Sequence, residues 1–273
     1  MRISTVQLRT RVMLGVLIVT AAFIPPRGAA AQSEFRSPRN ADVDARGARS
    51  IRVEAGAGLL RVEGRAGIAQ VRVRGTAHAS QRAWLDEIRL VAERRGTDVF
   101  IKAEIPDRNG SLWNTFVNHV RALDLVIEVP TTVPLSVVDG SGESKFIGTG
   151  SIDLEDGSGD VEIRGAKGTV RVNDGSGNVV LSGIEGDVSL GDGSGNIDAR
   201  NITGNFTIVE DSSGDIAVTG VGGTMRVRDD GSGDIDVDRI AGDFVVDHDG
   251  GGSIRYNTVT GSVSIPDRKR RRG

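Results

Sequence analysis

The chain has 273 residues, of which 38 are glycine and none is cysteine, and its formal net charge is −3. Without cysteine it can form no disulfide, so its stability must come from burial and backbone pairing. Residues 139–265 hold 9 basic and 23 acidic residues, a net of −14, whereas residues 32–138 hold 16 and 13, a net of +3. Such an acidic body argues against nucleic acid as the main partner, because phosphate binding needs clustered cations.

Residues 1–31 have the form of a secretory signal peptide. Three arginines precede an apolar run over residues 12–24, and three alanines ending at Ala31 form a small-residue cleavage site. The apolar run is shorter than the roughly 20 residues that span a bilayer. We therefore expect cleavage near Ala31, export to the periplasm or the cell surface, and no transmembrane span. A retained anchor is the alternative.

Residues 32–48 are rich in charge and contain Pro38, so we expect a flexible leader. Residues 49–138 then follow a looser β pattern, with a hairpin expected over 88–105 that turns at Gly96. Two short helical segments are expected in this region, near 80–86 and over 111–121.

The second of these segments carries Trp113, Phe116 and Val120 at helical spacing. Because it lies outside the repeat described next, it is the best candidate for contact with a partner. The favoured interpretation is that it caps the first coil and hides unpaired strand edges.

From Asp139 onward one short phrase recurs. Asp-Gly-Ser-Gly begins at residues 139, 156, 174, 192 and 230, and variants begin at 211 and 249, so the starts lie 17 to 19 residues apart. Within each unit, glycines nine or ten residues apart lead into apolar pairs at period 2, such as Val170 and Val172. Such pairs are typical of strands with one buried face. Residues 139–265 are therefore predicted to form a β-solenoid of about seven coils with two strands each.

The segment Leu-Val-Ile-Glu-Val-Pro at 125–130 leads into iterated Ser-Gly-Asp-Ile and Gly-Asp-Val phrases. With the Ala79-Ser80 segment before the expected hairpin, these phrases resemble the bacterial toastrack, or putative adhesin, family over roughly residues 50–265. The resemblance implies an envelope or extracellular β-repeat protein. It brings no catalytic motif that could be carried over to this chain.

The aspartates that open the turns should stack in a column at about 4.8 Å per coil. Such a row repels itself unless its members are protonated, hydrogen-bonded or bridged by a cation. Calcium is one hypothesis, and the favoured one is that each aspartate caps its own turn. The residues concerned are Asp156, Asp174, Asp192, Asp211 and Asp230. A second polar column (Asp160, Asn178, Asn196, Asp215, Asp234) should add hydrogen bonds along the stack.

No catalytic residue or cofactor is predicted. A nucleophilic serine needs a base within hydrogen-bond reach, and no histidine matches a particular turn serine. The repeat contains one tyrosine, Tyr256, and no tryptophan, so it lacks aromatic platforms for sugar rings.

The basic tail after residue 265 carries Arg268, Lys269, Arg270, Arg271 and Arg272. It could touch an anionic surface, although a solvated run that blunts the last coil is favoured.

The sequence as a whole predicts an exported, non-enzymatic binding or structural surface of the bacterial envelope, with an envelope protein or a polysaccharide as partner. A carbohydrate-active enzyme on a β-helix and a periplasmic sensor of envelope stress are the alternatives.

Overall fold

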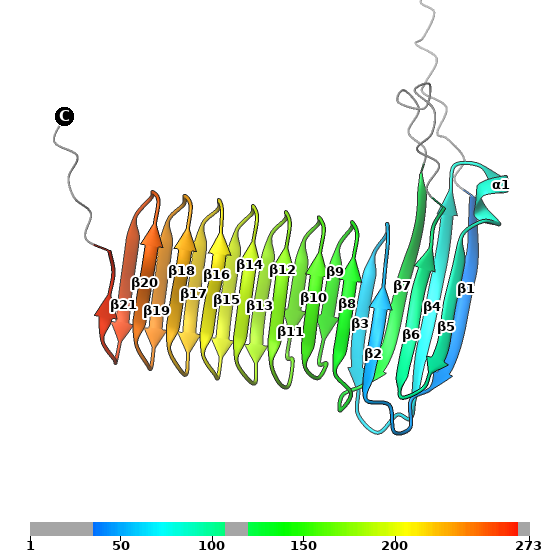
Figure 1. The fold of residues 1–273 in the computed structure, drawn as a ribbon, viewed down its shortest axis with the longest axis horizontal. Coiled ribbons are helices and arrows are strands. Elements are labelled where there is room, and N and C mark those ends of the chain that lie inside the picture. The colour runs from blue at the N-terminus through cyan, green and yellow to red at the C-terminus, as the bar shows by residue number, and fades with distance from the viewer. Residues whose placement is uncertain (1–34, 107–119, 267–273) are drawn as a thin grey trace, which may run out of the picture. The chain divides into compact units, whose positions relative to one another are not determined.

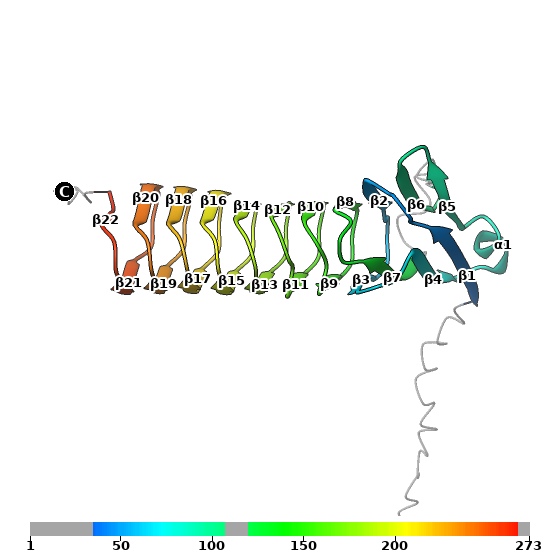
Figure 2. The same cartoon turned by 90° about the horizontal axis from the view of Figure 1, so that it is seen from below.

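The computed structural model describes residues 35–106 and 120–266, which belong to one unit of the chain. Within these residues nearly all regular structure is β-strand, arranged in two 11-stranded sheets that face each other (Figures 1 and 2). The one helix described, α1 (Arg82–Leu85), has four residues. The all-β solenoid predicted from the sequence is confirmed.

Each sheet combines N-terminal strands with strands of the repeat. Sheet A runs, from edge to edge, through β1 (Phe35–Asp44), β4 (Gln70–Ala79), β7 (Arg121–Pro130), β3 (Leu60–Arg65), β9 (Ser144–Ile147), β11 (Val161–Arg164), β13 (Val179–Ile184), β15 (Ile197–Ile202), β17 (Ile216–Val221), β19 (Ile235–Ile240) and β21 (Ile254–Val259). Sheet B runs through β5 (Arg89–Arg95), β6 (Asp98–Glu104), β2 (Ser50–Glu54), β8 (Leu135–Asp139), β10 (Ile152–Asp156), β12 (Val170–Asp174), β14 (Val188–Asp192), β16 (Phe206–Asp211), β18 (Met225–Asp230), β20 (Phe244–Asp249) and β22 (Val263–Ser264).

The repeat forms the predicted coils. From β8/β9 to β20/β21, each coil gives one strand to each sheet, and neighbouring coils pair in parallel. The pairing keeps equivalent positions together, so that Val170 lies beside Val188 and Val188 beside Phe206. The expectation of about seven coils with two strands each is confirmed.

The apolar pairs of the strands form one continuous core between the sheets. Phe146, Phe206 and Phe244 are among its largest fully buried side chains. Each fully buried aliphatic or aromatic side chain stabilises the fold by about 1.5–3 kcal/mol. A third apolar position fills the corners, where Ile184 is the register partner of Ile202.

The turns after each aspartate stack backbone on backbone, and this requires glycine. Gly195 has a φ of 139°, and a Cβ placed there would lie 1.7 Å from the carbonyl oxygen of Gly177 in the preceding coil. A side chain would therefore force the coils apart, and its backbone conformation would also be strained. This double demand accounts for the glycine at this place in successive coils.

The chain enters the solenoid early and then leaves it. β2 and β3 form a coil that pairs with β8 and β9 on one side and with β6 and β7 on the other. The chain therefore builds β4 to β7 at one end before it returns to β8. The predicted N-terminal β region is confirmed, and its strands extend the same two sheets.

That end of the sheets is closed by antiparallel strands and the helix. β1 pairs with β4, β4 pairs with β7, and β5 forms a hairpin with β6. α1 contacts β1 and β4, and β1 contacts β5. Arg39 of β1 donates hydrogen bonds to the carbonyl oxygens of Leu85 and Ile88, at 2.8 and 2.9 Å. We call β1, β4–β7 and α1 the N-terminal cap.

The flexible leader expected over residues 32–48 is wrong for residues 35–44. These residues form β1, whose ten positions all pair with β4. Charge does not prevent this, because β1 is an edge strand whose charged side chains reach solvent. Pro38 is tolerated because an edge strand need not donate every backbone hydrogen bond.

The other local expectations concern the hairpin and the two helices. The hairpin is confirmed as β5 and β6, with Gly96 at the turn at a φ of 61°. The helix expected near 80–86 is confirmed as α1. Of the helix expected over 111–121, residues 111–119 lie outside the described residues, and Arg121 begins β7.

Candidate functional site

A column of aspartates runs along the solenoid where the sheet B strands end, with one aspartate at the last position of each strand from β8 to β20. Each is the register partner of the next. We call these residues the carboxylate column: Asp139, Asp156, Asp174, Asp192, Asp211, Asp230 and Asp249. The first six are between 0% and 6% exposed. Neighbouring strands lie about 4.8 Å apart, so each carboxyl group has another directly above or below it.

Part of the column makes the turn hydrogen bonds that the sequence favoured. Oδ1 of Asp174, Asp192 and Asp211 accepts the backbone N–H two residues later, at 3.1–3.2 Å. At the first coil, Oδ2 of Asp139 accepts a hydrogen bond from Ser144 Oγ at 2.6 Å. Asp139 Oδ1 also accepts the backbone N–H of Gly140 at 2.8 Å, so both of its oxygens are satisfied, whereas Oδ2 of Asp174, Asp192 and Asp211 is left over.

Other oxygens of the column are buried without a hydrogen-bond partner in the described parts of the chain, including both of Asp156 and both of Asp230. Burial, and then the charges of Asp139 and Asp174, raise the pKa of Asp156 to about 7. Burial and the charges of Asp192 and Asp230 likewise raise the pKa of Asp211 to about 7.

The same causes act on two further members of the column. Burial and a charged neighbour raise the pKa of Asp192 and of Asp230 to about 6. Near neutral pH the column therefore holds both protonated and ionised carboxyl groups. A protonated carboxyl can donate to an ionised neighbour, which two ionised carboxylates cannot do.

The column is a poor match to a calcium site. Calcium takes six to eight oxygen ligands around one point, whereas a single row offers carboxyl groups from successive coils along a line. Among the described residues no group of three or more His, Cys, Asp or Glu side chains could hold a metal ion. Calcium on Asp156, Asp174, Asp192, Asp211 or Asp230 stays a hypothesis, with the test given below.

The second polar column forms a hydrogen-bonded ladder on the outside of the turns. Oδ1 of Asp160 accepts the backbone N–H of Asn178 at 2.9 Å, and Asn178 does the same for Asn196 at 3.1 Å. The ladder continues with Oδ1 of Asn196, which accepts the backbone N–H of Asp215, and with Oδ1 of Asp215, which accepts that of Asp234, each at 2.9 Å. The side chain of one coil therefore ties down the backbone of the next, as the sequence predicted.

A further ladder runs along the opposite turns and was not foreseen. Asp187, Asn205 and Asp243 each accept the backbone N–H of the equivalent residue in the next coil, at 2.7–2.9 Å. The signal was present in the sequence: each of these residues follows a glycine, as do Asp160, Asn178 and Asn196.

The outer face of sheet A contains two open hollows where small side chains lie between longer polar ones. One, of about 550 Å³, is lined mainly by Asp160, Glu162, Asn178, Val180, Asn196 and Asp198. The other, of about 310 Å³, is lined by residues of β17, β19 and β21, among them Ala217 and Thr219. Open polar hollows suit an extended ligand better than an enclosed small molecule.

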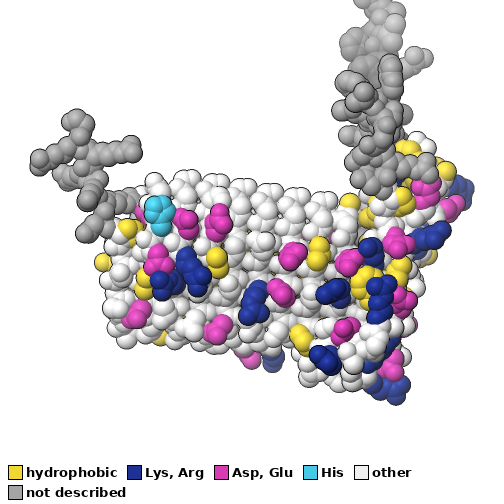
Figure 3. Space-filling model, viewed as in Figure 1, with side chains coloured by type: hydrophobic (Ala, Val, Ile, Leu, Met, Phe, Trp, Pro, Cys, Tyr) yellow, Lys and Arg dark blue, Asp and Glu magenta, His cyan; other side chains and the backbone are white. Residues whose placement is uncertain are grey.

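The outer face of sheet B mixes charges of both signs (Figure 3). Arg226 of β18 pairs with Asp247 of β20 at 2.8 Å. His248 is 70% exposed, and its Nε2 lies 4.0 Å from Asp229 Oδ1. No contact brings it to a turn serine, so the described structure adds no support for a nucleophilic serine.

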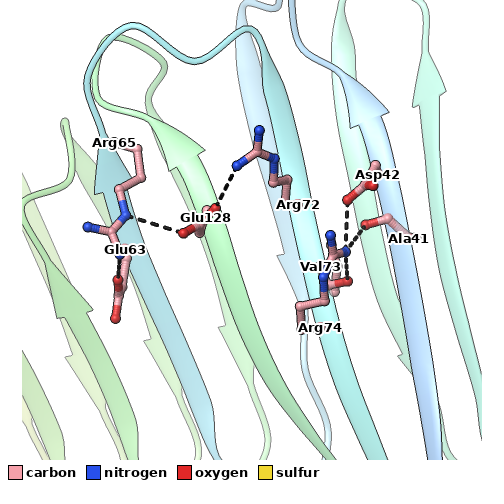
Figure 4. A network of polar contacts seen from close by, with 8 residues as sticks. All are labelled: Ala41, Asp42, Glu63, Arg65, Arg72, Val73, Arg74 and Glu128. Atoms are coloured by element: carbon pink, nitrogen blue, oxygen red, sulfur yellow. Dashed lines mark hydrogen bonds and ion pairs between the residues drawn. The ribbon is translucent and has the colours of Figure 1, made fainter.

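The cap carries an ion-pair network on the outer face of sheet A (Figure 4). The carboxylate of Glu128 in β7 forms ion pairs with Arg65 of the neighbouring strand β3 and with Arg72 of β4, both at 3.3 Å. Arg65 forms a second ion pair, with Glu63. Arg74 of β4 contacts Asp42 of β1 at 2.8 Å. Exposed pairs of this kind contribute about 0–1 kcal/mol each, so they align strands more than they stabilise them.

The residues predicted for partner contact are mostly outside the described structure. Trp113 and Phe116 lie in the segment 107–119, and the tail residues Arg268 to Arg272 lie beyond residue 266. Val120 is described and is 43% exposed. In the described parts of the chain, no helix is long and apolar enough to cross a membrane.

Comparison with known proteins gives structural likeness alone. No family model and no curated protein matches the chain. A putative cell adhesion protein from Clostridium sporogenes is 12% identical, with a TM-score of 0.35 over 85% of this chain and 99% of its own. A putative adhesin from Bacteroides fragilis is 15% identical, with a TM-score of 0.41 over 85% and 98%.

A third solved structure, a putative lipid binding protein from Parabacteroides distasonis, is 13% identical, with a TM-score of 0.48 over 84% of this chain and 97% of its own. What any of the three binds is a property of that protein.

Proposed function

We propose that this chain is an exported, non-enzymatic protein of the bacterial envelope whose two sheets act as a binding or structural surface. The observation that carries the proposal is the register of the coils, which is kept from coil to coil apart from one shift between β14 and β16. It places equivalent outward side chains about 4.8 Å apart in straight rows, a spacing at which a regular polymer or an extended protein segment meets repeated polar groups.

The chemistry of the described residues supports presentation over catalysis. The most strongly perturbed carboxyl groups are buried in the column and cannot reach a large substrate. The outward carboxylates largely serve ladders and ion pairs, such as Asp198 with Arg200 at 2.7 Å. The open acidic hollow around Val180 is the best candidate contact surface for a polysaccharide or for a basic segment of an envelope protein.

Export is tested by expressing the full chain with a C-terminal tag, fractionating the cells and sequencing the N-terminus of the tagged protein. We expect the protein in the periplasm or at the surface, beginning at Gln32. Uncleaved protein in the membrane fraction would support the retained anchor, and cytoplasmic protein would overturn the export part of the proposal.

Binding is tested with immobilised residues 32–273 and purified envelope polysaccharide, with envelope protein extract in a parallel arm. Val180→Arg places a bulky cation in the hollow, and Val209→Arg makes the matched change on an exposed valine of β16. We expect Val180→Arg to reduce retention at least fivefold and Val209→Arg to leave it unchanged. Release of new reducing ends from the polysaccharide would favour the enzyme, and specific retention of a membrane signalling protein would favour the sensor.

A further inference from the structure

The C-terminal coil shows its core positions to solvent. Tyr256 is the register partner of Val237, yet it is 49% exposed where Val237 is 4% exposed. Val263 is the partner of Phe244 and is 36% exposed, where Phe244 is 0% exposed. Ile265 is 39% exposed. These residues occupy inward positions of the repeat, so the last coil presents a cross-section of the core.

Both sheets also end here with a strand that has one neighbour. β21 pairs with β19 alone and β22 with β20 alone, so the outward edges carry backbone groups with no strand beside them (Figure 2). At the opposite end the edge strands β1 and β5 also have one neighbour each, but they contact each other and α1 contacts β1. An unprotected sheet edge is a ready template for another strand.

The chain's own tail is a poor cover for this end. After Ile265 the sequence continues with Pro266 and seven residues that include five bases and one acid. Proline lacks the N–H that strand pairing needs, and a run of like charges supplies no apolar side chain to place over Tyr256 or Val263. These residues therefore suit the end poorly, whereas a second copy of the same coil offers both a strand edge and apolar side chains.

We propose that the C-terminal coil binds the C-terminal coil of a second copy of this chain, related by a two-fold axis perpendicular to both sheets. That operation reverses the strand direction, so β21 meets the second copy's β21, and β22 meets its β22, in antiparallel pairs at the same time. Each edge then meets the same edge of the second copy, as a two-fold axis requires. The closed N-terminal cap offers no such matching pair of edges.

Charge is compatible with this arrangement. A pairing centred on Tyr256 sets Arg255 opposite Asn257 of the other copy, so no like charges face each other within the strand pair. The tail from residue 266 has a net charge of +4, from five bases and one acid, and it follows a repeat with a net charge of −14. The tail and the repeat therefore carry charges of opposite sign.

The size of the end predicts a weak dimer. β21 has six residues and is about 20 Å long, β22 has two residues, and two packed sheets with their side chains are roughly 20 Å thick. The two faces together then bury at most about 800 Å², less than stable specific interfaces do, so we expect a dissociation constant on the order of 10 µM or higher.

The test is sedimentation velocity of residues 32–273, which contain every described strand, from about 1 to 300 µM. We expect a shift from monomer to dimer with rising concentration. Tyr256→Lys should keep the protein monomeric throughout, whereas Val209→Lys, the same change at an equally exposed site far from the end, should behave like the wild type. Circular dichroism confirms that both variants fold.

The geometry is tested separately with cysteine. Facing Cα atoms in an antiparallel pair lie about 4.5–5.5 Å apart, within the range of a disulfide. Tyr256→Cys should therefore give a covalent dimer on mild oxidation, and Val209→Cys should not.

Three results would overturn the proposal. One is a wild-type protein that stays monomeric at 300 µM, and another is growth beyond dimers. The third is a dimer that appears only after deletion of residues 266–273, which would show that the tail covers the end.

Discussion

The repeat and the N-terminal cap solve the same packing problem in opposite ways. In the repeat, identical positions stack in parallel, so glycine lies on glycine, aspartate near aspartate and valine beside valine. In the cap, antiparallel strands bring unlike residues together, as in the pairs of Arg72 with Glu128 and of Arg74 with Asp42. Stacking like on like suits apolar and amide side chains but is costly for charges. The repeat therefore carries its strain in the turns and in the carboxylate column, and the cap carries little.

The largest expected difference lies in glycine. Gly195→Ala should destabilise the protein by about 4 kcal/mol, because the new Cβ overlaps a backbone carbonyl of the adjacent coil. Gly96→Ala in the cap hairpin should cost about 1–2 kcal/mol, since a Cβ there meets nothing within 4 Å and only the positive φ is strained. Urea unfolding of both variants checks this. Equal losses would show that conformation, and not coil stacking, dominates.

The second difference is the response to pH. Four members of the column, Asp156, Asp192, Asp211 and Asp230, have pKa values of about 6 to 7 in the folded protein, above the ordinary value of 3.8, so the folded state holds protons that the unfolded chain releases. The contribution of these carboxyl groups to the free energy of unfolding is full below about pH 4 and is lost as pH rises through 6 to 7. We expect a loss of at least about 3 kcal/mol between pH 4 and pH 8, the amount for one carboxyl group whose pKa rises from 3.8 to about 6, measured by urea unfolding at each pH. Stability that rises over this interval would contradict the buried column.

Replacing one aspartate by asparagine should change stability at pH 8 in opposite directions in the repeat and in the cap. Asp211→Asn keeps an oxygen for the Ser213 N–H but removes a buried charge. It should stabilise the protein by about 1–2 kcal/mol at pH 8 and have little effect at pH 4. In the cap, the hydrogen bond from Arg46 lowers the pKa of Asp44 to about 2, so Asp44→Asn should destabilise the protein at pH 8. Thermal melts at both pH values test the pair.

The exposed ladder should give a smaller effect. Asn196→Ala removes the acceptor for the backbone N–H of Asp215 and should cost about 1 kcal/mol. Asn40→Ala, at an exposed position of β1 in the cap, should change stability by less than about 0.5 kcal/mol. Native-state hydrogen exchange of the Asp215 amide provides a local readout. Unchanged protection there would show that the ladder does not hold the coils.

The smallest expected effect is that of calcium. Millimolar calcium should raise the melting temperature only slightly, because a row of carboxyl groups does not surround one ion with enough oxygen ligands. A large rise that a chelator reverses would show that the column binds calcium near neutral pH. Asp211→Asn should then abolish that rise, and Asp44→Asn should not.

The sequence predicted the repeat well because its regularity reports the packing directly. The spacing of Asp139 and its equivalents gave the coil length, and pairs such as Val170 and Val172 gave the buried face. The cap was harder, because β1 owes its existence to β4, some 30 residues away, and its own charge and Pro38 favour a flexible segment. No local pattern in the sequence predicts that β2 lies between β6 and β8, or that β3 lies between β7 and β9.

For this protein, the sequence alone determined the fold class, the coil length, the inward apolar face and the need for glycine at the turns. Each of these follows from local periodicity and conformational preference. The tertiary structure decided which aspartate oxygens are buried without partners, that the two sheets continue into an antiparallel cap, and that the core is open at Tyr256. Those features depend on what lies beside a residue in space, and a repeat with equivalent coils does not encode where it is closed and where it is left open.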